Sequence, residues 1–153
     1  MKYVDTLVVF REVPDEITLA INISGCPVNC PGCHSSYLTQ DIGEELNEES
    51  LAELIKKNPG ITCVSFMGGD ANPKYVGELA DWVHSNTKLK VCWYSGRPLE
   101  LNDRNIVNKL NFVKVGPYID EFGPLDSPKT NQRFYKVEGA ELIDWTYKFK
   151  KEN

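Results

Sequence analysis

Three cysteines lie within eight residues in the stretch ISGCPVNCPGCHSS, which covers residues 23–36. They are Cys26, Cys30 and Cys33. Any one of them alone would most often be a small buried hydrophobic residue. Three cysteines in a loop this rich in proline and glycine cannot all point into one core. A disulfide needs two cysteines, and a closed zinc or iron–sulfur site usually has four ligands. The spacing therefore indicates a metal site that lacks one protein ligand.

Three kinds of site compete for these residues. His34 could complete a zinc site, but it is adjacent to Cys33, whereas ligands within one cluster usually sit two to four residues apart. Cys30 and Cys33 form a thioredoxin-like C-x-x-C pair, which leaves Cys26 unexplained. A 4Fe–4S cluster on three thiolates uses all three cysteines and leaves one iron with an open position for a substrate. Gly32 and the neighbouring prolines would let the backbone wrap tightly and present amides to the sulfides.

The composition narrows the function classes. The chain has 153 residues, which suits a single domain over residues 1–153. Its net charge of −5 argues against a nucleic-acid-binding module, which would show a basic stripe. The first residues resemble neither a signal peptide nor a membrane span, so we expect a cytoplasmic protein with no membrane partner. Thiols stay reduced in that compartment, so five cysteines favour metal or redox chemistry over disulfides.

The elements that must position the cysteines follow from the apolar pattern. Residues 3–10 and 17–24 are rich in β-formers and flank the turn VPDE, which predicts a hairpin that leads directly into the cysteine loop. Asn47 and Asn72 are expected to cap two helices. Strands are expected in TCVSFM, LKVCWYS and NFVKV, with a short helix in DRNIVNKLN. This alternation predicts an α/β fold with parallel βαβ units and a covered sheet.

Two segments near the end of the chain stand apart. Residues 116–131 form a long polar stretch with no predicted element, and a loop of that length in a compact domain is usually functional or mobile. In LIDWTYKF, the residues Ile143, Trp145, Tyr147 and Phe149 alternate with polar ones. That alternation predicts a terminal strand.

The C-x-x-x-C-x-x-C spacing after a first strand resembles that of the radical S-adenosylmethionine (SAM) enzymes. The resemblance implies a short, partial (β/α) barrel with a mostly parallel sheet, here with an N-terminal hairpin and a C-terminal strand. It also implies two cofactors, a 4Fe–4S cluster and SAM. In that family the open iron binds the amino and carboxylate groups of SAM, and one electron from the cluster cleaves SAM to methionine and a 5′-deoxyadenosyl radical.

A second motif, MGGD, ends the next predicted strand. Two glycines and an aspartate are by themselves an ordinary turn. In context they resemble the Gly-Gly-Glu motif of the family, whose backbone meets the SAM amino group. The resemblance implies that Gly68, Gly69 and Asp70 bind the cofactor, with Asp70 in the place of a glutamate. It implies the same for Gly32, Cys33 and His34, since the residue after the third cysteine often lies near the adenine.

Three later motifs, WYSGR, VGPYIDE and TNQRFY, narrow the resemblance. Together with the first two motifs they are similar to the activating proteins of anaerobic (class III) ribonucleotide reductase, over residues 17–135. That resemblance implies a protein substrate: the radical takes hydrogen from the Cα of a glycine near the C-terminus of the large reductase subunit. It also implies a small-protein electron donor such as flavodoxin. Many relatives carry an aspartate where this chain has Val115.

The residues leave other functions open. The chain could activate a different glycyl radical enzyme, or be a small-molecule radical SAM synthase of the deazaguanine-forming type. Outside the enzymes, it could be an iron–sulfur electron carrier or a zinc module, neither of which would bind SAM. Within the class III interpretation, residues 116–131 are a candidate docking loop for the reductase.

We predict that anaerobically reconstituted protein holds about four iron atoms per chain, because a 4Fe–4S cluster has that stoichiometry. Serine at Cys26, Cys30 or Cys33 is expected to abolish iron binding, whereas serine at Cys63 or Cys92 is not. Metal analysis together with the visible absorption spectrum measures both. Bound zinc in place of iron would contradict the assignment.

Overall fold

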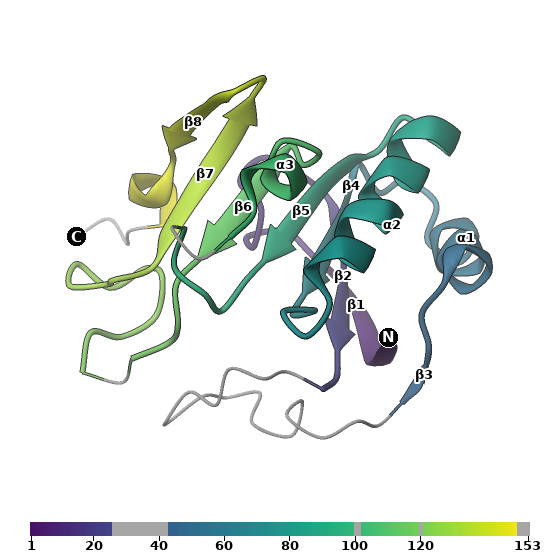
Figure 1. The fold of residues 1–153 in the computed structure, drawn as a ribbon, viewed down its shortest axis with the longest axis horizontal. Coiled ribbons are helices and arrows are strands. Elements are labelled where there is room, and N and C mark those ends of the chain that lie inside the picture. Colours follow the sequence, from purple (N-terminus) through teal and green to yellow (C-terminus); the bar gives the residue numbers. More distant parts are fainter. Residues whose placement is uncertain (26–42, 100–101, 120, 150–153) are drawn as a thin grey trace.

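The computed structural model describes residues 1–25, 43–99, 102–119 and 121–149. In these residues eight strands form one sheet in the order β3-β1-β2-β4-β5-β6-β7-β8 (Figure 1). Their bounds are β1 (Lys2–Val9), β2 (Thr18–Ile23), β3 (Glu44–Glu45), β4 (Cys63–Met67), β5 (Lys90–Tyr94), β6 (Phe112–Val115), β7 (Arg133–Glu138) and β8 (Glu141–Asp144). The four central strands β2, β4, β5 and β6 run parallel, and the flanking strands pair antiparallel. The sheet is therefore mixed.

The predicted hairpin is confirmed. Strands β1 and β2 pair antiparallel, from Tyr3 opposite Ile23 to Val9 opposite Thr18. The turn between them contains Asp15, which has a positive φ of 67°. Aspartate tolerates that left-handed backbone better than most residues, in keeping with the turn chemistry of its segment.

Both capped helices are confirmed as well. Helix α1 (Glu48–Lys57) begins after Asn47, whose side chain accepts a hydrogen bond from the backbone of Ser50 while the Ser50 hydroxyl accepts one from the Asn47 amide. Helix α2 (Pro73–Asn86) begins after Asn72 with proline in its first position. These caps satisfy amides that a helix start leaves unpaired. A third, short helix is α3 (Arg104–Val107).

All three helices cover the same face of the sheet (Figure 1). Leu51 of α1, Val76 of α2 and Val107 of α3 share one buried cluster with strand residues such as Phe66 and Trp93. Parallel strands need crossover connections, and here α1, α2 and α3 are the elements that lie between β2, β4, β5 and β6 in the chain. The crossovers place the carboxyl ends of these strands at one edge.

The opposite face of the sheet is covered by loops. Val13 of the hairpin turn and Leu125 of the loop after β6 pack in a second buried cluster with Cys63, Cys92 and Phe134. Phe149 of the 3₁₀ helix η3 (Thr146–Phe149) packs against the same cluster. We call this side of the sheet the loop-covered face.

The end of the chain corrects one prediction and adds an element that the sequence pattern did not reveal. The segment from Ile143 to Phe149 was expected to be one strand, but β8 ends at Asp144 and η3 follows. The Thr146 amide donates to the Asp144 carboxylate at 2.9 Å, and the Thr146 hydroxyl accepts from the Phe134 amide at 2.9 Å. These bonds end the strand. Strand β7 was not predicted from the sequence.

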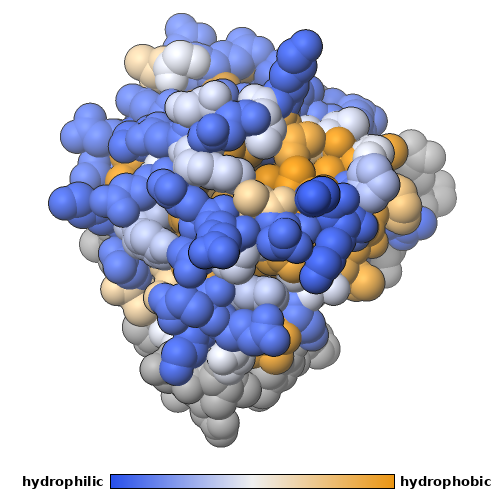
Figure 2. Space-filling view, turned by 90° about the vertical axis from the view of Figure 1, so that its right-hand side faces the viewer, coloured by the Kyte–Doolittle hydropathy of each residue, from blue (hydrophilic) through white to orange (hydrophobic). Residues whose placement is uncertain are grey.

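No helix of the described residues is both long enough and apolar enough to cross a bilayer. The side of the molecule that carries α1 and the N-terminus shows an apolar area bordered by hydrophilic groups (Figure 2).

Candidate functional site

The carboxyl ends of the four parallel strands meet at one edge of the sheet. Asn22 of β2 lies opposite Met67 of β4, Met67 opposite Tyr94 of β5, and Tyr94 opposite Lys114 of β6. The segments that follow these residues therefore lie side by side at the lower edge in Figure 1. They are Ser24–Gly25, Gly68–Asp70, Ser95–Arg97 and Gly116–Pro117. Ligand sites of parallel α/β sheets lie at this edge.

The glycine turn after β4 is in close contact with the end of β2. Gly68 and Gly69 have φ angles of 111° and 96°, which side chains with a Cβ rarely adopt. A Cβ on Gly68 would lie 3.1 Å from the Ile23 carbonyl oxygen, and one on Gly69 would lie 2.8 Å from Cγ2 of Val76. Both positions therefore require glycine, for backbone conformation and for packing.

Hydrogen bonds hold the first of the two glycines in place. The Gly68 amide donates to the Tyr94 carbonyl at 3.0 Å, and the Gly68 carbonyl accepts from the indole of Trp93 at 2.6 Å. The backbone amides of Gly69 and Asp70, by contrast, have no hydrogen-bond partner within the described residues. Gly69 and Asp70 are both buried. Buried amides need hydrogen-bond partners, and no described residue supplies one here, so this turn offers polar groups that suit a bound ligand.

Asp70 uses its carboxylate to tie the turn after β4 to the turn after β5. One oxygen accepts from the Ser95 hydroxyl at 2.6 Å, and the other accepts from the Gly96 amide at 2.8 Å. The side chain is buried, with Asp70 only 1% exposed. The Asp70 carboxylate therefore positions the backbone of these turns. The polar groups of Asp70 that remain for a ligand are its backbone amide and carbonyl.

Lys114 is a buried amine at the same edge, and sequence analysis did not single it out. Its ammonium donates to the Ser95 carbonyl at 3.3 Å and to the Gly116 carbonyl at 2.8 Å. A lysine inside the otherwise apolar strand NFVKV was the signal that could have identified it, because buried lysines are rare unless they are paired. Lys114 links the turns after β5 and β6, as Asp70 links those after β4 and β5.

Residues of the TNQRFY motif support the turn after β6. The Gln132 side-chain amide donates to the Gly116 carbonyl at 3.4 Å, and that of Asn131 donates to the Pro117 carbonyl at 3.0 Å. Asn131 Oδ1 is buried with no hydrogen-bond partner among the described residues. Arg133 is half-exposed and lies 3.7 Å from the Asp144 carboxylate. The motif thus joins the start of β7 to the site edge.

Two buried thiols, Cys63 and Cys92, and the partly buried phenol of Tyr94 lie on the loop-covered face. Burial raises the pKa of Cys63 to about 12 and raises the pKa of Cys92 well above its usual value. Burial also raises the pKa of Tyr94, whose hydroxyl donates to the Glu12 carbonyl. Raised thiol pKa values disfavour the thiolate, which is the form that binds metal. Cys63 and Cys92 are therefore core residues.

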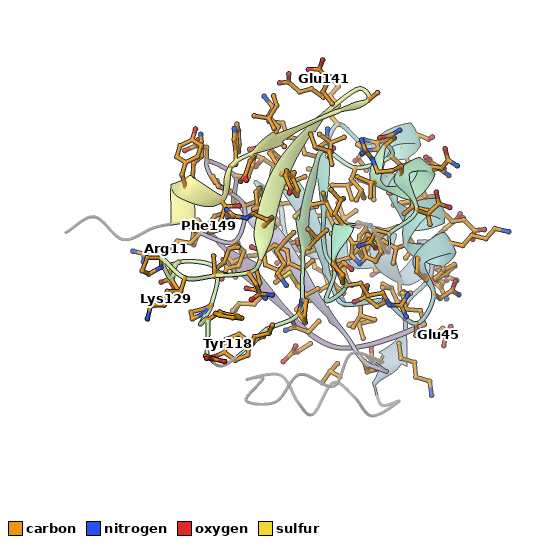
Figure 3. The ribbon with its side chains drawn as sticks, turned by 60° about the vertical axis from the view of Figure 1, so that its left-hand side comes forward. Arg11, Glu45, Tyr118, Lys129, Glu141 and Phe149 are labelled. Atoms are coloured by element: carbon orange, nitrogen blue, oxygen red, sulfur yellow. The ribbon has the colours of Figure 1, made fainter. Side chains whose placement is uncertain are left out.

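A groove of about 780 Å³ opens between the hairpin turn, the loop after β6 and η3. Its walls include Phe10, Arg11, Leu125 and Phe149, with Tyr94 also part of the lining. Arg11, Lys129 and Phe149 lie on this side of the molecule, whereas Tyr118 lies lower, toward the site edge (Figure 3). The groove is thus on the loop-covered face.

The predicted ligand residues divide into two groups. Cys26, Cys30, Cys33, Gly32 and His34 lie outside the described residues. Gly68, Gly69 and Asp70 lie together at the site edge, where a Cβ on Gly68 or Gly69 would contact Ile23 at the end of β2. The sequence thus leads from the carboxyl end of β2 directly into the first cysteine.

A family model described as a 4Fe-4S single cluster domain matches residues 17–134. The chain belongs to this family. It is therefore an iron–sulfur protein that binds one 4Fe–4S cluster. The matched span runs from the residue before β2 into the start of β7, so it contains all four parallel strands and their turns. No curated protein and no solved structure matches the chain.

We predict that Asp70→Asn lowers the free energy of unfolding by about 1–3 kcal/mol, because the two bonds use different carboxylate oxygens and the amide nitrogen that replaces one of them cannot accept. Asp81→Asn is the matched control, since its carboxylate forms an exposed pair with Lys109 at 2.7 Å. Exposed pairs contribute about 0–1 kcal/mol. Urea unfolding of the anaerobic protein measures both variants. Equal effects would contradict the positioning role of Asp70.

We further predict that stability falls as the pH rises above about 9. The folded state holds the Cys63 proton up to a pKa of about 12, whereas the unfolded thiol loses it near the ordinary cysteine pKa of 9.0. The folded state therefore binds more protons in this window, and Cys63 alone should cost about 2 kcal/mol between pH 8 and pH 10.5. Urea unfolding of Cys63→Ala should show a smaller loss over the same interval. An identical pH dependence would contradict the burial of this thiol.

Proposed function

We propose that this protein is a radical SAM activase that generates a glycyl radical on the large subunit of anaerobic ribonucleotide reductase. The observation that carries the proposal is the contact between Gly68 and the end of β2. It places the glycine turn against the strand that leads into the three cysteines. On this proposal, the mixed sheet with its four parallel central strands is a short, open form of the radical SAM partial barrel.

The cluster ligands would be Cys26, Cys30 and Cys33, and the open iron would supply reductive cleavage of SAM. The chain's own turns would bind and orient that molecule. The carbonyl of Asp70 has no hydrogen-bond partner within the described residues, so it could accept from an amino group. The Gly69 and Asp70 amides could donate to an anionic or carbonyl oxygen. These groups fit the polar end of an amino acid.

The side chains of Asp70 and Lys114 would keep this site rigid through their bonds to Ser95. Asp70 accepts from the Ser95 hydroxyl, and Lys114 donates to the Ser95 carbonyl. The turn after β5 is therefore held from both sides by buried charged groups. Preorganised polar groups in a buried site orient a ligand more strongly than the same groups in water.

The loop of residues 116–131 is the proposed docking surface for the reductase. Its ends are fixed at Gly116 and Asn131, and Leu125 anchors its middle in the second core cluster. Between these anchors, Phe122 remains 38% exposed. An aromatic side chain between such anchors can contribute to binding at a low entropic cost.

The test is anaerobic reduction with SAM, scored for 5′-deoxyadenosine, then repeated with the reductase and scored for a glycyl radical by electron paramagnetic resonance. Gly69→Ala should reduce deoxyadenosine formation by about tenfold or more, because its Cβ would displace the turn. Gly60→Ala is the control, since Gly60 also has a positive φ of 91° but open space around it. Phe122→Ala should leave deoxyadenosine unchanged and lower glycyl radical formation by about tenfold.

Tyr147→Ala is the control for Phe122, since Tyr147 is an aromatic residue that is 62% exposed on η3. Iron content and circular dichroism identify variants that failed to fold. A reduced cluster that yields no deoxyadenosine would favour the electron carrier over the activase. Deoxyadenosine without a glycyl radical on the reductase would indicate another glycyl radical enzyme or a small-molecule substrate.

A further inference from the structure

One arginine at the site edge has a side chain without a partner. Arg97 ends the WYSGR motif, in the turn that follows β5. It is only partly exposed. Among the described residues, no carboxylate or carbonyl accepts a hydrogen bond from its guanidinium. Arginine side chains that are withdrawn from water are normally paired, so the five N–H donors of this one suit a ligand.

The backbone of Arg97, by contrast, is fixed on both sides. Its amide donates to the Ser95 hydroxyl oxygen at 3.2 Å, and its carbonyl accepts from the Gly116 amide at 2.8 Å. The Ser95 hydroxyl in turn donates to the Asp70 carboxylate at 2.6 Å. The turns after β4 and β6 therefore hold the start of this side chain in place, whereas its charged end has no such bond.

The other three arginines of the chain are paired or lie elsewhere. Arg104 donates to a backbone carbonyl at 3.0 Å, and Arg133 lies 3.7 Å from a carboxylate oxygen. Arg11 lines the groove on the loop-covered face. Arg97 is thus the arginine of the site edge whose charge is available to an anion.

The charges around this turn favour an anionic ligand. Lys114 is buried, and its ammonium bonds only to uncharged carbonyls in the contacts described above. The Asp70 carboxylate accepts two hydrogen bonds from the turn after β5. The turns after β4, β5 and β6, together with Lys114, therefore carry two cationic side chains and one carboxylate. A partly buried excess of positive charge is offset by a bound anion.

The ligand of the proposed function has an anionic group within reach of this arginine. An α-amino acid carries its amino group and its carboxylate on one carbon atom, so an amino group that meets the Asp70 carbonyl places the carboxylate close by. Neighbouring strands lie about 4.8 Å apart, which sets the turn after β5 one strand spacing from the glycine turn. An extended arginine side chain spans that distance. Its planar guanidinium matches a carboxylate with two parallel hydrogen bonds.

We propose that Arg97 binds the carboxylate of SAM and makes the site selective for ligands that carry it. The inference rests on the proposed function, since it assigns a residue to the ligand of that site. Charge-assisted hydrogen bonds in a site partly closed to water are stronger than the same bonds on an open surface. Loss of Arg97 should therefore weaken SAM more than a ligand without the carboxylate.

Isothermal titration of the anaerobic full chain with its cluster tests the inference. Arg97→Gln is expected to raise the dissociation constant for SAM by about tenfold or more, because it removes hydrogen bonds to a charged group. Decarboxylated SAM differs only by the missing carboxylate. The same variant should change its dissociation constant by less than about twofold, because the mutation and the ligand change remove the same interaction.

Arg104→Gln is the matched control, since it removes the same charge from an exposed arginine of α3 that donates to a backbone carbonyl. It should leave both dissociation constants unchanged. Arg97→Lys keeps the charge but not the planar fork, so its affinity for SAM should lie between those of the wild type and Arg97→Gln. Iron content and circular dichroism check that each variant is folded.

Three results would overturn the inference and leave the activase proposal standing. The first is unchanged SAM affinity in Arg97→Gln. The second is an equal loss of affinity for SAM and for decarboxylated SAM, which would assign Arg97 to another part of the ligand. The third is normal SAM binding and deoxyadenosine formation with a lower yield of glycyl radical, which would assign Arg97 to the reductase. A wild-type protein that binds no SAM would overturn both proposals.

Discussion

The parallel pairing of β2 with β4 is the constraint on which the rest of the site depends. It sets the end of β2 at Ile23, three residues before Cys26 in the sequence, against the glycine turn after β4. The contact is so close that a Cβ on Gly68 would lie 3.1 Å from the Ile23 carbonyl oxygen. The α1 crossover that joins the two strands enforces this arrangement, because parallel neighbours cannot be joined by a tight turn. The end of β2 and the glycine turn are thereby brought to one edge of the sheet, and the sequence continues from that end of β2 into Cys26.

Buried charge then stiffens that edge. Asp70 and Lys114 are both removed from water and bond from opposite sides to the turn after β5. A buried charge is costly unless hydrogen bonds satisfy it. Here the bonds join three consecutive strand ends, so the turns after β4, β5 and β6 behave as one unit. Turns held in this way can orient a ligand without changing their own conformation when it binds.

Much of this arrangement followed from the sequence. The hairpin, the helices capped by Asn47 and Asn72, and the glycine turn have local signals, since caps and turns are formed by neighbouring residues. The network of Asp70, Ser95 and Lys114 has none, because its members are far apart in the chain. The alternation from Ile143 to Phe149 led to the wrong prediction of one continuous strand. Hydrogen bonds of Thr146 to Asp144 and Phe134 end the strand at Asp144. Strand β7 was not predicted because its sequence RFYKVE does not alternate regularly between polar and apolar residues, and its burial in the structure is irregular as well.

We propose that the open iron of the cluster and the glycine turn bind one SAM molecule between them. Electron–nuclear double resonance of the reduced protein tests it most directly, with SAM labelled by ¹⁵N at its amino group and ¹³C at its carboxylate. We expect hyperfine coupling of the cluster spin to both labels, and weaker coupling in Gly69→Ala than in Gly60→Ala. A cluster signal that is unchanged by SAM and shows neither coupling would contradict it.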